Sequence, residues 1–148
     1  MFKLLYDKLD DLTVDLNHLA GQITTEILGR SSYYNEPEFK GVDIDFDYIY
    51  SLIAGTLNGN TNASLTLVEL LYPNAFVKME HRKPIYGDRY CMSAFEIKQY
   101  PWYIWDDAKT FSVALLKALI MSIILIEKST IPPVMPILKV ENGGFGVD

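Results

Sequence analysis

A group of basic and aromatic side chains in the second half of the sequence has the composition of a ligand-binding site. The segment Lys78–Lys98 holds five basic and three acidic residues, which gives it a net charge of +2 within a chain of net charge −6. Aromatic residues are frequent within and after this segment: Tyr86, Tyr90, Tyr100, Trp102, Tyr103 and Trp105. Cations beside flat rings can bind a nucleotide, because the cations pair with phosphate and the rings stack on the base.

Three basic and three aromatic residues are therefore the candidate ligand-binding residues: Arg82, Lys83, Arg89, Tyr90, Trp102 and Trp105. The same residue types also anchor protein–protein interfaces, so a protein partner is a second interpretation. A third interpretation is structural, since aromatic residues at a hairpin often pack against the core and basic residues at its tip are often solvated. The sequence leaves all three open.

Other polar residues lack the spacing of a metal or catalytic site. The alternating aspartates of Asp43–Asp47 resemble a calcium loop, but Tyr48 and Ala54 stand where such a loop needs glycine and glutamate. Helix capping by Asp45 explains them better. Neither His18 nor His81 has cysteines or carboxylates at zinc-ligand spacing. We therefore expect no metal, no cofactor and no enzymatic activity, with an enzyme of dispersed active site as the alternative.

Two strands are predicted to position the basic segment. Apolar and polar residues alternate along Ala75–His81 and again along Tyr90–Lys98. The link between them, Arg82–Arg89, contains a proline and a glycine, as turns often do. The pattern predicts an antiparallel hairpin that carries the basic residues at its tip.

Helices are predicted before the hairpin. Apolar residues spaced three and four apart predict one amphipathic helix over residues 4–28, ended by Gly29 in a left-handed conformation. A second helix should start near Asp45 and end at Asn58–Asn60. Its expected buried stripe is Phe46, Ile49, Tyr50, Ile53 and Leu57. Residues 67–72 fit a short helix that begins near Thr66, and a strand over residues 65–71 is the alternative.

The last helix is predicted over Asp107–Lys128, with Asp106, Asp107 or Thr110 as its cap. It is apolar almost all round, which is typical of a helix buried on most sides. We expect it to contact a sheet on one side and a second subunit on the other, which predicts a homo-oligomer. Prolines then favour an extended arm over residues 131–148, after a single domain over residues 1–130.

Composition restricts the class of protein. The chain has 148 residues, of which 49% are hydrophobic and 22% are charged, as expected for one folded domain. Its acidity argues against duplex nucleic acid as a partner. A single cysteine, Cys91, fits a reducing compartment. The longest apolar run, Phe111–Ile126, is shorter than the roughly 18–20 residues of a membrane span, so we expect a cytoplasmic protein without membrane contact.

Together these elements predict an α+β fold in which a small antiparallel sheet has helices packed on it in layers, in the order helix, helix, strands, helix. Three segments of the sequence resemble the phage ABA-sandwich domain family: Asp15–Gly29, Val42–Gly55 and Ala108–Ala118. The sequence departs from that family at Arg30, where an aromatic residue often follows the glycine. The resemblance implies a phage or prophage origin and layered helices and sheet, and it implies no defined activity.

Two functions fit these features. The first is a phage-encoded binding protein that inhibits a host defence, either by occupying a host protein or by sequestering a nucleotide signal. The second is a bacterial immunity protein whose acidic helices block a basic toxin.

Overall fold

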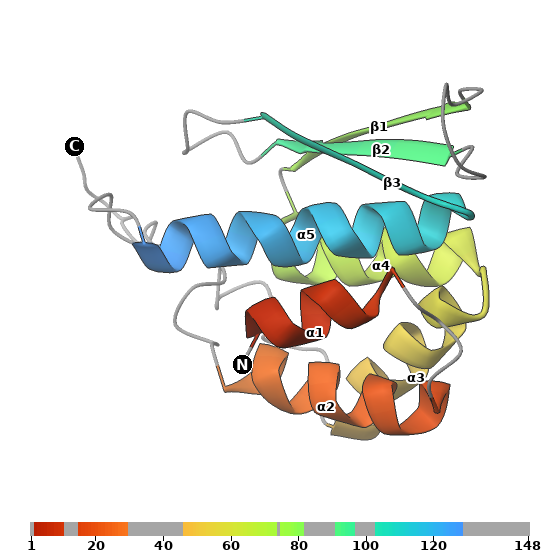
Figure 1. The fold of residues 1–148 in the computed structure, drawn as a ribbon, viewed down its shortest axis with the longest axis vertical. Coiled ribbons are helices and arrows are strands. Elements are labelled where there is room, and N and C mark those ends of the chain that lie inside the picture. Colours follow the sequence, from red (N-terminus) through yellow and green to blue (C-terminus); the bar gives the residue numbers. More distant parts are fainter. Residues whose placement is uncertain are drawn as a thin grey trace.

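The protein is an α+β fold of five helices and a three-stranded sheet in the residues that the computed structural model describes, which are 2–10, 15–29, 46–73, 75–81, 91–96 and 103–128 (Figure 1). The elements in chain order are α1 (Phe2–Lys8), α2 (Leu16–Leu28), α3 (Phe46–Leu57), α4 (Thr61–Leu71), β1 (Phe76–His81), β2 (Cys91–Glu96), β3 (Tyr103–Ala108) and α5 (Phe111–Lys128). The predicted fold class is confirmed, while the predicted arm at 131–148 lies outside the described residues.

The sheet is antiparallel in the order β1-β2-β3. The predicted hairpin is confirmed, since Val77 of β1 pairs with Phe95 of β2. The third strand was not predicted. The sequence analysis began the last helix at Asp107, whereas Asp107 lies in β3. The last helix begins at Phe111 instead, and the Thr110 hydroxyl oxygen caps it by accepting from the Val113 amide at 3.3 Å.

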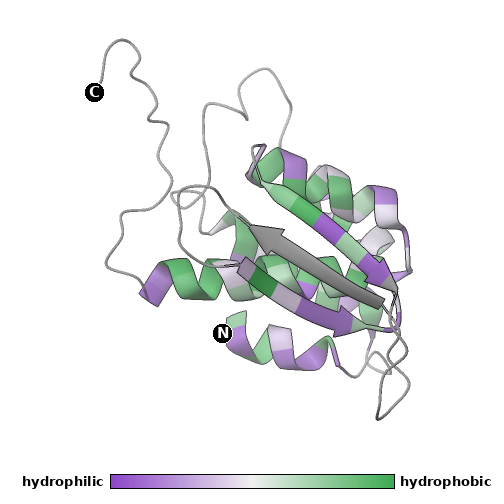
Figure 2. Cartoon of the chain, turned by 90° about the horizontal axis from the view of Figure 1, so that it is seen from above, coloured by the Kyte–Doolittle hydropathy of each residue, from purple (hydrophilic) through white to green (hydrophobic). Residues whose placement is uncertain are grey.

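All five described helices lie on one side of the sheet (Figure 1). α5 packs directly under β2 and β3, with α4 beside it, and α1, α2 and α3 form the layer beyond (Figure 1). Seen from above, the outer face of the sheet carries no described helix (Figure 2). Ile104 and Ala108 of β3 alternate with Tyr103, Trp105 and Asp107, and Ala108 is buried on the α5 side.

The predicted single helix over residues 4–28 is wrong, because the chain forms two helices there. α1 ends in a turn in which the Leu9 amide donates to the Tyr6 carbonyl at 3.1 Å. α2 starts afresh after Asp15, whose carboxylate accepts from the amides of Asn17 and His18 at 3.0 and 3.3 Å. Asp15, which lies inside the predicted continuous helix, is an N-cap instead.

The end of α2 also differs from the prediction. Gly29 ends the helix in a right-handed conformation, with φ of −68°, and its amide donates to the Thr25 carbonyl at 3.0 Å. This hydrogen bond continues the helical pattern, so no left-handed residue is needed at that point.

The turn between α3 and α4 forms at Asn58–Asn60, where the sequence predicted the end of the helix. Gly59 has φ of +93°, a conformation that glycine adopts without steric cost. Asn60 caps α4 by accepting from the Ala63 amide at 3.1 Å. The open choice between helix and strand is settled as a helix, and its cap, Asn60, lies six residues before the predicted cap at Thr66. Phe46, expected in the buried stripe of α3, is 42% exposed, and Asp45 lies outside the described residues.

α5 is the centre of the core. Most of its residues are buried, against the sheet on one side and against α1, α3 and α4 on the other. The expectation that a second subunit covers α5 is therefore wrong, because the helices of its own chain cover it. Self-association stays a prediction that must involve another surface, and light scattering that gives a 16.9 kDa particle would contradict it.

Within the described part of the chain, no helix combines the length and apolarity needed to cross a bilayer.

Candidate functional site

One of the six predicted ligand-binding residues can be placed. Trp105 lies in the middle of β3 and is half-buried. The other five lie outside the described residues: Arg82, Lys83, Arg89, Tyr90 and Trp102. The site that the structure describes is therefore built around Trp105 and its neighbours on the sheet.

Trp105 has a cation and a second ring beside it. The Lys78 ammonium of β1 lies 5.9 Å from the centre of the Trp105 ring, within the range of a cation–π interaction. Both residues pair with Ala94 in β2, so the lysine side chain reaches across the middle strand. Tyr103 meets Trp105 edge-on, with ring centres 5.7 Å apart and an interplanar angle of 81°. Lys78 belongs to the basic segment of the sequence, although it was not among the six candidate ligand-binding residues.

Tyr103 and one further aromatic side chain, Phe76, are exposed on the same part of the sheet. Phe76 is 55% exposed and Tyr103 is 40% exposed. Both pair with Glu96 in β2, so they occupy one row across the sheet, next to the row of Lys78 and Trp105. We call Phe76, Lys78, Tyr103 and Trp105 the aromatic face. The sequence analysis did not single out Phe76, because a phenylalanine at a strand end reads equally well as core.

A second polar group lies under the other face of the sheet, around Lys117 of α5. The Lys117 ammonium is 2.7 Å from Asp10 and 3.1 Å from Asp106, and it donates to the Asp107 carbonyl at 2.9 Å. The Lys117 side chain is only 2% exposed. An ammonium has three N–H donors, so these three oxygens satisfy it fully.

Tyr6 of α1 completes this charged group. Its hydroxyl donates to Asp106 at 2.5 Å, and its ring lies 5.6 Å from the Lys117 ammonium. Burial raises the pKa of the Tyr6 phenol, and the hydrogen bond to the Asp106 carboxylate raises it further. The phenol is therefore held protonated, as a donor. We call Tyr6, Asp10, Asp106, Asp107 and Lys117 the lysine cluster.

The lysine cluster is built to join elements. It links α1, β3 and α5, and each of its donors already has an acceptor within the cluster. A catalytic lysine must reach a substrate with a free nitrogen, whereas this nitrogen is buried and saturated. The sequence indicates this cluster only through Lys117, a single lysine inside an apolar helix. That pattern does not identify the carboxylates with which the lysine pairs.

Comparisons with protein-family models, with curated proteins and with solved structures found no match. In the described part of the chain, no three histidine, cysteine, aspartate or glutamate side chains are grouped to hold a metal ion. The phage-family resemblance stays a prediction, and function must be argued from the aromatic face itself.

Proposed function

We propose that this chain is a non-enzymatic binding protein that docks a protein partner on its aromatic face. The observation that carries the proposal is the exposure of Phe76 and Tyr103 next to the Lys78–Trp105 pair. Large apolar side chains that are exposed on one face of a sheet often mark an interaction surface. Tyrosine and tryptophan also supply much contact area with few rotatable bonds, which makes them common anchors in interfaces.

A protein partner fits the described surface better than a nucleotide does. Phe76 and Tyr103 sit at the two edge strands, with β2 between them, and strands are about 4.8 Å apart. The exposed rings are therefore spread across the sheet rather than gathered around one base. Among the described residues of this face, Lys78 is the cation, and its ammonium already faces Trp105. The arginines that a nucleotide's phosphates would need lie outside the described residues.

The absence of enzymatic activity is part of the same proposal, and the lysine cluster supports it. That cluster brings together a lysine, a tyrosine and three aspartates, which are residue types that can transfer protons. The donors of Lys117 and Tyr6 are directed at acceptors within the cluster, and Lys117 is buried. Their arrangement suits a structural joint.

The resemblance to phage proteins adds a class of partner to the proposal, namely a host defence protein. Site-specific crosslinking in a bacterial extract tests it. A photoreactive residue at position 103 should crosslink a defined protein. Position 4 is the matched control, because Leu4 is also exposed, at 60%. A photoreactive residue there should not crosslink that protein, because Leu4 lies on α1 away from the sheet.

The crosslinked protein would then be purified and its affinity measured by calorimetry. Phe76→Asp should weaken binding at an unchanged melting temperature, while the matched control Leu4→Asp should bind as the wild type does. Equal binding by all three proteins would contradict the proposal. If purified nucleotides bind instead and quench the tryptophan fluorescence of the protein, the nucleotide-sequestering hypothesis replaces it.

A further inference from the structure

The strand β3 carries the aromatic face on one side and the lysine cluster on the other. Side chains alternate along a strand, so Trp105 points to the outer face of the sheet while Asp106, the next residue, points toward Lys117 of α5. Their Cα atoms are ~3.8 Å apart, the distance across a trans peptide. A shift of the backbone at Asp106 therefore displaces the Trp105 ring.

The strand β3 is held on one edge by strand pairing. It is an outer strand of the sheet, and within the described residues it pairs with β2 alone. On its inner side, Ile104 is partly buried against the core, and Ala108 is buried but small. Asp106 lies between these two apolar anchors, where its polar contacts can fix the middle of the strand against the helices.

Both carboxylate oxygens of Asp106 are engaged. Oδ1 lies 3.1 Å from the Lys117 ammonium and accepts from the Asp107 amide at 2.9 Å, and Oδ2 accepts from the Tyr6 hydroxyl at 2.5 Å. Lys117 also donates to the Asp107 carbonyl at 2.9 Å. Hydrogen bonds to an ionised group are among the stronger ones in proteins. Two helices, α1 and α5, thus hold the strand directly beside Trp105.

The contacts of Trp105 on the outer face depend on the position of its ring. The Lys78 ammonium lies 5.9 Å from the ring centre, close to the limit of about 6 Å for a cation–π interaction. Tyr103 meets the ring edge-on, with ring centres 5.7 Å apart. A small displacement of the Trp105 ring would therefore end the contact with Lys78 and change the shape of the aromatic face.

We propose that Tyr6 and Lys117 are positioning residues of the aromatic face, which hold the Trp105 ring in place through Asp106. The N-terminal helix, which supplies Tyr6, then contributes to partner binding from the other side of the sheet. This effect on affinity rests on the function proposed above, whereas the effect on the position of the Trp105 ring does not.

Acrylamide quenching of Trp105 fluorescence tests the position of the ring without any partner. The chain has two tryptophans, so the parent protein and every variant carry Trp102→Phe. Tyr6→Phe removes the hydrogen bond to Asp106 and keeps the ring on α1. It should raise the quenching constant of Trp105 and shift its emission, at unchanged far-UV circular dichroism. Lys117→Met should raise the quenching constant further, and Tyr6→Phe alone decides the outcome if the lysine variant does not fold.

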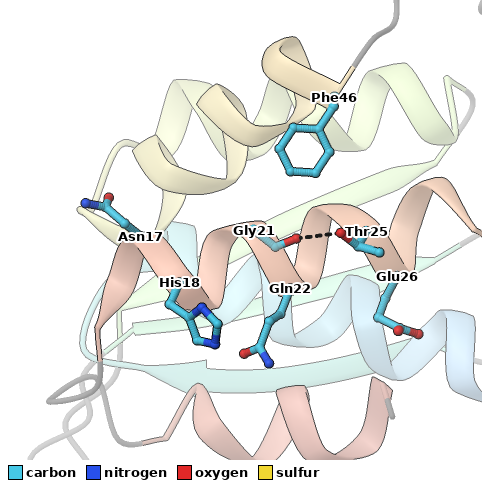
Figure 3. A pocket seen from close by; sticks show the side chains of 7 residues that line it. All are labelled: Asn17, His18, Gly21, Gln22, Thr25, Glu26 and Phe46. Carbon is cyan, nitrogen blue, oxygen red and sulfur yellow. Dashed lines mark hydrogen bonds between the residues drawn. The ribbon is translucent and has the colours of Figure 1, made fainter.

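Two control variants separate the position of the ring from general stability. Asn60→Ala removes the hydrogen bond that caps α4, so it destabilises the fold without changing a contact of β3. Phe46→Leu alters an exposed ring that projects from α3 toward α2, in the helical layer beyond α5 (Figures 1 and 3). Both variants should leave the quenching of Trp105 at the value of the parent protein.

The partner identified by crosslinking gives the second readout. Tyr6→Phe should weaken its binding roughly fivefold, within the range of effects that act through neighbouring residues. Asn60→Ala should bind it as the parent does.

The proposal is overturned if Tyr6→Phe leaves the quenching of Trp105 unchanged, if Asn60→Ala raises it as much, or if the partner binds Tyr6→Phe as tightly as the parent. Failure of the proposed function gives a different result. Phe76→Asp would then bind as the wild type does, while the quenching of Trp105 would still respond to Tyr6→Phe.

Discussion

The ammonium nitrogen of Lys117 lies 2.7 Å from a carboxylate oxygen of Asp10, a residue 107 positions earlier in the chain. This ion pair fastens the end of α1 to the centre of α5. Asp106 of β3 contacts the same nitrogen, so the first helix, the last strand and the last helix meet at one buried charge. The stability of the N-terminal part of the fold should depend on this contact.

Lys117→Met should lower the free energy of unfolding by about 3 kcal/mol, because Asp106 would be left buried beside no cation. The side chain of Asp106 is only 10% exposed, so water can solvate its negative charge only in part. Urea unfolding measures the loss. Lys128→Met, an exposed substitution in the last turn of α5, is the matched control and should change stability little. Replacing both charges, as in Lys117→Met with Asp106→Leu, should recover part of the loss. Equal stability of the Lys117 and Lys128 variants would show that the cluster contributes nothing.

Tyr6 should make the protein sensitive to alkaline pH. Its pKa is raised in the folded state by burial and by Asp106, whereas the unfolded chain has the ordinary value of about 10. The contribution of the neutral phenol to stability is therefore complete below pH of about 10 and is lost as the pH rises further, because the unfolded state releases its proton first. In Tyr6→Phe, the free energy of unfolding should depend less on pH above about 10, where the tyrosine of the unfolded wild type ionises.

The control for this experiment is Tyr103→Phe, which leaves the Tyr6–Asp106 hydrogen bond intact and should retain the alkaline loss of the wild type. Unfolding free energies at each pH, measured by urea titration, compare the three proteins. A Tyr6→Phe variant whose alkaline loss equals that of the wild type would contradict the assignment.

Asn60→Ala should destabilise the protein by about 1 kcal/mol, because the Ala63 amide would lose its capping acceptor. Asn62→Ala offers a close control, since Asn62 is exposed in the first turn of the same helix. It should be neutral or slightly stabilising, because alanine favours helix more than asparagine does. Thermal melts monitored by circular dichroism rank the two variants, and the reverse order would refute the cap.

Two glycines should respond to alanine with opposite signs. Gly59→Ala should cost about 1 kcal/mol, because φ of +93° is unfavourable for a residue with a Cβ. Gly21→Ala should gain up to about 1 kcal/mol of stability through helix propensity. A Cβ added at Gly21 would have its nearest neighbour at 3.9 Å, which is an ordinary contact. Unfolding in urea measures both differences.

The amino-acid sequence determined those elements whose residues interact with near neighbours. Alternation of apolar and polar residues identified the β1–β2 hairpin, and three-and-four spacing identified the buried side of α3 through Ile49, Ile53 and Leu57. The apolar composition of α5 predicted its burial. Each of these patterns reports on one face of one element, so it can be read without knowing the rest of the fold.

Only the tertiary structure decided β3, the break between α1 and α2, and the lysine cluster. The strand β3 was missed because Asp106 occupies a position that faces the helices, where the alternation rule expects an apolar residue. The break after α1 was missed because Leu9 and Leu19 continue the same apolar spacing on both sides of it. Both exceptions involve Lys117, which pairs with Asp106 of the neighbouring strand and with Asp10, a residue 107 positions earlier in the chain. A local pattern cannot reveal such a partner, because the charges become neighbours only when the helices and sheet have packed.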